Sequence, residues 1–94
     1  MSAPPRAEAR LEVKNRLGLH ARAAALVVQT MTKFAAEITI TREDQSVNGK
    51  SILGLMMLAA APGTLLEVVA EGADAEAALA ALAAVFEARF HEDG

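Results

Sequence analysis

A histidine near the start of a predicted helix is the residue of this sequence best suited to chemistry. His20 follows a loop that contains Gly18, and Arg22 comes two positions after it. The first backbone N–H groups of a helix lack internal acceptors, and the helix dipole places partial positive charge there. A neutral imidazole is a good nucleophile near neutral pH. His20 could therefore carry an anion such as a phosphoryl group beside those donors and the Arg22 guanidinium.

The same pattern also fits an ordinary surface or capping histidine. No Ser/His/Asp arrangement or carboxylate pair lies near His20 in the sequence. An enzyme would need a second catalytic group and a substrate pocket, and neither is predicted. The other histidine, His91, lies among acids near the C-terminal end and is expected to be exposed. Two histidines so far apart have no ligand spacing, so we predict no metal site.

Length and composition exclude several classes of protein. The 94 residues support one domain, and the formal net charge of −3 comes with no basic cluster. A nucleic-acid or RNA-binding module would need clustered Lys and Arg or exposed aromatic residues. The chain contains no cysteine, its apolar runs, such as residues 55–61, are far too short to span a bilayer, and residues 1–10 do not form a secretory signal. We therefore expect a cytoplasmic protein with no nucleic-acid partner and no membrane insertion.

The spacing of apolar residues predicts seven elements in the order β-α-β-β-α-β-α. Strands are expected at residues 11–14, 37–41, around 47 and at 66–70, and helices at 21–34, 51–58 and from 74 onward. Asp74 is expected to cap the last helix. One apolar face per strand predicts an α+β fold, a two-layer open-faced sandwich with three helices on one face of a four-stranded antiparallel sheet. Residues 1–9 and 92–94 are expected to be tails around a domain at 10–91.

Two segments resemble signatures of the HPr family, the phosphocarrier proteins of the bacterial phosphotransferase system. Residues 18–24 (GLHARAA) are similar to the family segment with the phosphorylated histidine, and residues 48–56 (NGKSILGLM) to the segment around its regulatory serine. The interval between the segments and the order of elements also agree, over roughly residues 11–90. The family usually has proline where this chain has Ala23. Alanine suits the first helical turn, so we expect an intact site.

The resemblance implies a phosphoryl carrier, and not an enzyme, with a phosphohistidine at His20. Arg22 and Ala21 would stabilise the phosphate. Ser51 would be both the N-cap of the second helix and a site of regulatory phosphorylation. The resemblance also implies a surface for docking partners. Its expected members are Leu19, Lys50, Ile52, Leu53 and Met56.

The family also implies the partners. Enzyme I would be the donor and Enzyme IIA domains the acceptors, and a serine kinase/phosphorylase and transcriptional regulators would act on or read the carrier. No cofactor is implied, and we expect a monomer. The alternative is an HPr-like regulatory or nitrogen-branch carrier that signals by its phosphorylation state and does not drive sugar uptake. Residues 13–15 and the acidic end after Phe90 resemble that branch, whereas residues 49–51 resemble the kinase-regulated carbon branch.

Overall fold

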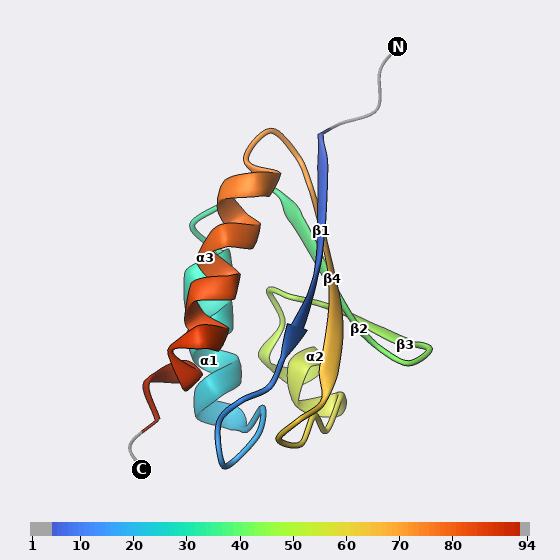
Figure 1. Cartoon of the computed structure of the whole chain (residues 1–94). Helices are drawn as coiled ribbons and strands as arrows, with labels where there is room; N and C mark the ends of the chain where they lie inside the picture. The colour runs from blue at the N-terminus through green and yellow to red at the C-terminus, as the bar shows by residue number, and fades with distance from the viewer. Residues whose placement is uncertain (1–4, 93–94) are drawn as a thin grey trace.

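A computed structural model describes residues 5–92 and has the predicted order of elements (Figure 1). A short 3₁₀ helix, η1, follows the last α-helix. The strands are β1 (Arg6–Glu12), β2 (Glu37–Arg42), β3 (Gln45–Asn48) and β4 (Leu65–Glu71), and the helices are α1 (Ala21–Met31), α2 (Ile52–Met57), α3 (Ala75–Glu87) and η1 (Arg89–His91).

The four strands form one antiparallel sheet in the order β1-β4-β2-β3. The central strand β4 pairs with β1 on one side and β2 on the other, so Val68 lies opposite both Ala9 and Ile40. A tight turn joins β2 to β3, which forms the edge. This arrangement confirms the predicted antiparallel open sheet.

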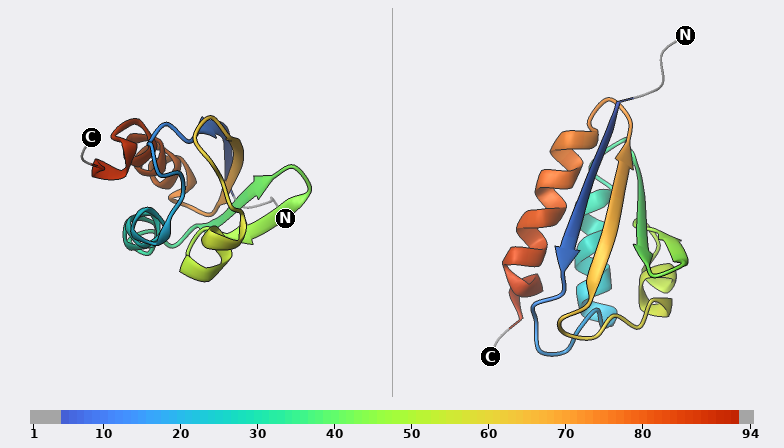
Figure 2. Two further views of the ribbon diagram at one scale, coloured as in Figure 1. Left: turned by 90° about the horizontal axis from the view of Figure 1, so that it is seen from below. Right: turned by 45° about the vertical axis from the view of Figure 1, so that its right-hand side comes forward.

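The helices cover one face of the sheet (Figure 2). In β2, Ile38 and Ile40 are buried whereas Glu37 and Thr39 are exposed, as the period-2 pattern predicts. The helix α3 packs against β1 and β4, and α1 packs against both α3 and α2. The buried side chains of the helices and strands form one core. The two-layer, open-faced α+β fold is therefore confirmed.

The first strand differs from the prediction. It begins at Arg6 and not at residue 11, and it ends at Glu12. All seven of its residues pair with β4, and Arg6 lies opposite Glu71. Residues 6–9 therefore belong to the sheet, so the expectation of a tail there was wrong. Residues 1–4 and 93–94 lie outside the described residues.

Asp74 occupies the N-cap position of α3, but its side chain does not cap that helix. Its two carboxylate oxygens instead accept hydrogen bonds from the backbone N–H groups of Ala35 and Ala36, each at 2.8 Å. These bonds, the one from Ala35 first, hold the pKa of the Asp74 carboxyl below its usual range. The predicted cap was wrong because the carboxylate instead fastens the start of α3 to the segment that leads into β2.

The loop between β1 and α1, the helix α2 and η1 gather at one end of the molecule, at the bottom of Figure 1. Gly18 makes the loop possible, because its φ is +70° and a Cβ there would lie 2.5 Å from the carbonyl oxygen of Ala60. The next residue, Leu19, donates its N–H to the same oxygen at 2.9 Å. The segment after α2 thus holds the loop that leads into α1.

Candidate functional site

His20 is the N-cap residue of α1, as the sequence predicted. Its backbone is extended, with φ −79° and ψ 178°, and its carbonyl oxygen accepts the N–H of Ala24 at 2.8 Å. Its side chain makes no capping hydrogen bond, and the side chain is 28% exposed. The N–H groups of residues 21–23, including that of Ala21, have no acceptor within the helix. The ring therefore lies at the positive end of α1 without occupying its donors.

A hollow of about 500 Å³ opens beside the histidine. Its lining combines polar side chains of the site with apolar ones of α1 and η1: Leu17, His20, Arg22, Ala25, Leu26, Gln29, Phe90, His91 and Glu92. Arg22 is exposed and makes no hydrogen bond or ion pair within residues 5–92. Its guanidinium is therefore available to an anion held at the ring.

A carboxylate from the C-terminal end also reaches this site. Oε2 of Glu92 accepts a hydrogen bond from Nδ2 of Asn15 at 2.7 Å, and Oε1 accepts the N–H groups of Arg16 at 3.0 Å and Leu17 at 3.2 Å. Asn15 is buried, and its Nδ2 also donates to the carbonyl oxygen of Gly18 at 2.7 Å. The Glu92 side chain is only 12% exposed. It therefore joins the end of the chain to the loop before His20.

These donors favour the charged carboxylate. The hydrogen bond from Asn15, followed by those from the backbone of Leu17 and Arg16, holds the pKa of Glu92 below its usual range against the opposing effect of burial. Oε2 of the same carboxylate lies 3.8 Å from Nε2 of His20. Nε2 of the ring is buried and has no hydrogen-bond partner within residues 5–92. Nδ1 is not among the buried atoms that lack a partner in this part of the chain. The two edges of the ring thus have different surroundings.

Ser51 is the N-cap of α2, and its Oγ accepts the N–H of Gly54 at 3.0 Å. The helix buries Leu55 and exposes apolar side chains on its other side. Ile52 is 42% exposed, Leu53 72% and Met56 43%. These three residues therefore form an exposed apolar surface at the same end of the molecule as His20, and Leu17, 68% exposed, adds to that end.

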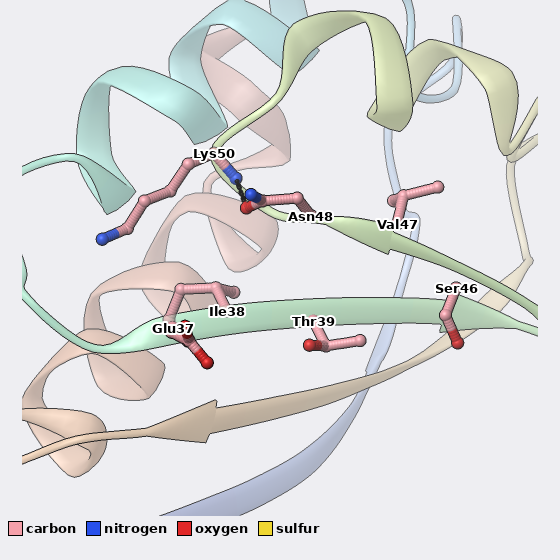
Figure 3. A pocket seen from close by; sticks show the side chains of 7 residues that line it. All are labelled: Glu37, Ile38, Thr39, Ser46, Val47, Asn48 and Lys50. Carbon is pink, nitrogen blue, oxygen red and sulfur yellow. Dashed lines mark hydrogen bonds between the residues drawn. The ribbon is translucent and has the colours of Figure 1, made fainter.

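Leu19 and Lys50, both expected at the docking surface, are less exposed than the apolar residues of α2. Leu19 is buried in the core, because the loop turns its side chain inward after Gly18. Lys50 is half-buried, and its ammonium donates to the carbonyl oxygen of Phe34 at 2.6 Å. Its backbone N–H is held by the Asn48 side chain at 2.8 Å (Figure 3). Leu19 is thus excluded from a surface contact, and the charge of Lys50 is engaged near the C-terminal end of α1.

The pair of Asn15 and Glu92 was not predicted from the sequence. In the sequence, residues 13–15 and the acidic end after Phe90 stand out only by their resemblance to the nitrogen branch, and Asn15 and Glu92 lie 77 positions apart. An asparagine three residues before a glycine and an acid in a C-terminal tail carry no spacing that predicts such a contact. The one signal for this contact is the rule that a buried polar side chain needs a hydrogen-bond partner, and it applies only once Asn15 is known to be buried.

Within residues 5–92, no helix has the length and apolar character needed to cross a bilayer. The same residues contain no cluster of three side chains able to bind a metal ion.

Comparisons with known proteins bear on the same residues. The family described as "PTS HPr component phosphorylation site" matches residues 7–88. Phosphocarrier protein HPr of Xylella fastidiosa (strain Temecula1) is 50% identical over 86 residues, 92% of this chain and 97% of the relative. Phosphocarrier protein NPr of Shewanella violacea is 40% identical over 85 residues, 90% and 93% of the two chains. The crystal structure of HPr-C-His from Thermoanaerobacter tengcongensis superposes with a TM-score of 0.89 at 43% identity, covering 94% of this chain and 99% of the other. This chain therefore belongs to the HPr family of phosphocarrier proteins of the phosphotransferase system.

Proposed function

We propose that this protein carries a phosphoryl group on His20, which it accepts from phosphorylated Enzyme I and passes to a histidine of an Enzyme IIA domain. The observation that carries the proposal is the placement of the ring at the N-terminus of α1, in a hollow that it shares with the guanidinium of Arg22. The helix donors and the arginine would balance the charge of the transferring group, which is mainly electrostatic work.

Nδ1 is the ring nitrogen that would take up the phosphoryl group. Nε2 is buried against Glu92, so an incoming phosphorus atom cannot approach it without displacing the end of the chain. Nδ1 is not enclosed in this way. Transfer would then proceed in line, with a bond from Nδ1 to phosphorus forming as the bond to the donor breaks.

Docking would use the apolar surface of Ile52, Leu53 and Met56 on α2. Exposed Leu17 would take part in this surface, whereas Leu19, which was expected there from the sequence, is buried and would not. An exposed patch of this kind suits a protein that binds several partners in turn, and methionine adapts to different shapes. A transient contact requires only a small interface.

Phosphorylation of Ser51 would regulate docking. The serine begins α2, which carries the proposed docking residues. A phosphate there would add about 1.5 to 2 negative charges to the surface that meets the partner and would repel an acidic one.

The test is incubation with Enzyme I and radioactive phosphoenolpyruvate, with acid-labile label on the carrier as the readout. We expect His20→Ala to abolish the label, and His91→Ala, which removes the other histidine, to retain it. Label that persists on His20→Ala would overturn the assignment. Transfer rates from the Enzyme I of the sugar branch and from that of the nitrogen branch would then identify the branch.

A further inference from the structure

The carboxylate of Glu92 accepts hydrogen bonds from three residues of the loop that precedes His20. Oε1 accepts two backbone N–H groups, those of Arg16 and Leu17, and Oε2 accepts Nδ2 of Asn15. In η1, Phe90 is buried and contacts the Phe86 ring edge-on at a centroid distance of 4.9 Å. The end of the chain is therefore anchored both by an aromatic contact and by polar bonds, which places Glu92 at a defined point beside the ring.

The buried, unpaired nitrogen of the imidazole faces this carboxylate. Nε2 of His20 has no hydrogen-bond partner within residues 5–92, and Oε2 of Glu92 lies 3.8 Å away. That distance exceeds a hydrogen bond, but such bonds often tighten only in the reactive complex. A buried N–H pointing at a carboxylate is favourable, whereas a buried lone pair pointing at one is repelled. The carboxylate therefore favours a proton on Nε2.

We infer that Glu92 is a positioning residue for His20: it keeps the ring proton on Nε2 and so leaves the lone pair on Nδ1, the nitrogen proposed to take up the phosphoryl group. This inference rests on the proposed function of His20. Carboxylates in enzymes orient a catalytic imidazole and select its tautomer in the same way. Glu92 acts through the ring and does not touch the phosphoryl group.

The charges in the transfer step then balance. A bond forms between Nδ1 of His20 and phosphorus, the bond from phosphorus to the donor histidine breaks, and its electron pair returns to the donor ring. The His20 ring keeps its proton on Nε2 and becomes a phosphorylated imidazolium with one positive charge, opposite the negative charge of Glu92. In the onward step the same ring leaves as a neutral imidazole. Glu92 would thus compensate the ring charge in both directions.

The other ionisable groups around the ring do not offer this contact. Arg22 on α1 and His91 on η1 also line the hollow, and neither forms a hydrogen bond or ion pair with His20. Arg16 reaches Glu92 through its backbone N–H. Within the described residues, Glu92 is the acid paired with the ring.

The test compares Glu92→Gln with Glu76→Gln. The glutamine introduced by Glu92→Gln would keep the size and one acceptor oxygen of the side chain but would lose the charge. Its oxygen in the place of Oε1 could still accept the N–H groups of Arg16 and Leu17. The NH₂ group in the place of Oε2 would lose the bond from Nδ2 of Asn15 and would turn a donor toward Nε2, which favours a proton on Nδ1. Glu76 is exposed in the first turn of α3, at the other end of that helix from η1, so its substitution changes the net charge equally.

The first readout is the ring tautomer by ¹⁵N NMR of the full chain, at a pH about two units above the ordinary histidine pKa of about 6.5. It needs no partner protein, and the native chain and Glu76→Gln provide the reference spectra. We expect the fraction of His20 with its proton on Nε2 to fall in Glu92→Gln and to stay native in Glu76→Gln. An unchanged tautomer in Glu92→Gln would overturn the inference even if His20 is the phosphorylated residue.

The second readout is phosphoryl uptake from phosphorylated Enzyme I. We expect kcat to fall about tenfold in Glu92→Gln, as for other groups that orient a functional histidine, with KM within about twofold of native. A faster uptake would show that the carboxylate competes with the phosphoryl group and would also overturn the inference. The expected tautomer shift in Glu92→Gln, together with no labelling of His20 in the native chain, would instead refute the proposed function and leave the ring contact standing.

Discussion

The hydroxyl of Ser51 accepts the backbone N–H of Gly54 at 3.0 Å, and this bond begins α2. The serine proposed as a regulatory site is therefore also the N-cap of the helix that carries the proposed docking residues. A change at Ser51 can act through the fold of α2 or through charge, and substitutions separate the two effects.

Ser51→Asp should keep the cap but lower phosphoryl transfer from Enzyme I, because aspartate is a good N-cap and adds negative charge. Ser51→Ala should cost about 0.5–2 kcal/mol of unfolding free energy through the lost cap. It should transfer at the native rate when folded. Urea unfolding and initial transfer rates measure both. Equal transfer by Ser51→Asp and the native chain would make the serine purely structural.

Arg22→Glu should slow phosphoryl uptake by on the order of 10²-fold, because it replaces a donor for the developing charge by a carboxylate. Arg10→Glu is the matched control. Arg10 is exposed on β1, and its ion pair with Glu67 at 3.8 Å contributes little to stability. Rapid-quench assays with phosphorylated Enzyme I provide the rates. Loss of activity in both variants to the same degree would assign the effect to net charge and not to Arg22.

Leu53→Glu should weaken docking without unfolding the protein, since the side chain is 72% exposed. Losing one apolar anchor of about 1.4 kcal/mol would raise KM for Enzyme I about tenfold and leave the unfolding midpoint near native. Leu65→Glu, at an exposed position of β4, is the control for a new surface charge. If KM rises only in Leu65→Glu, the docking surface lies on the sheet and not on α2.

Asp74→Asn should destabilise the protein most near neutral pH. The pKa of the folded Asp74 carboxyl is lowered from 3.8, mainly by the hydrogen bond from Ala35. The stabilisation from its charge is thus fully present above that ordinary value and is lost as the pH falls through the lowered pKa. Urea unfolding of both proteins between neutral and strongly acidic pH should show the difference shrinking. A difference that grew on acidification would contradict the sign, and Asp44→Asn in the exposed β2–β3 turn is the control.

Gly18→Ala should destabilise the protein more than Gly63→Ala. Both glycines have positive φ, +70° and +89°, which costs an L-residue about 1–2 kcal/mol. A Cβ at Gly18 would in addition approach the carbonyl oxygen of Ala60 to 2.5 Å, whereas one at Gly63 would meet nothing within 4 Å. Urea unfolding of the two variants measures the difference. Equal losses of unfolding free energy in the two variants would mean that the loop before His20 shifts to relieve the contact with Ala60 at little cost.

Local features of the sequence determined the order of the elements and the positions of the candidate site residues at helix N-termini. The alternation around Ile38 and Ile40 predicted β2 because a strand exposes every second residue. The loop-to-helix junction placed His20 at a helix N-terminus, and the serine before an apolar turn placed Ser51 at another. These features depend on neighbours a few positions apart, which the sequence displays directly.

Contacts between distant segments were decided only by the tertiary structure. The start of β1 at Arg6 depends on its pairing with Glu71, and the Asp74 carboxylate binds the N–H groups of residues 35 and 36 and not those of its own helix. Glu92 and Asn15 meet because α3 and η1 return the end of the chain to the loop before α1. The periodicity of neighbouring residues does not predict contacts between segments so far apart in the sequence. They arise when packing of the core brings hydrogen-bonding groups together that must then be paired.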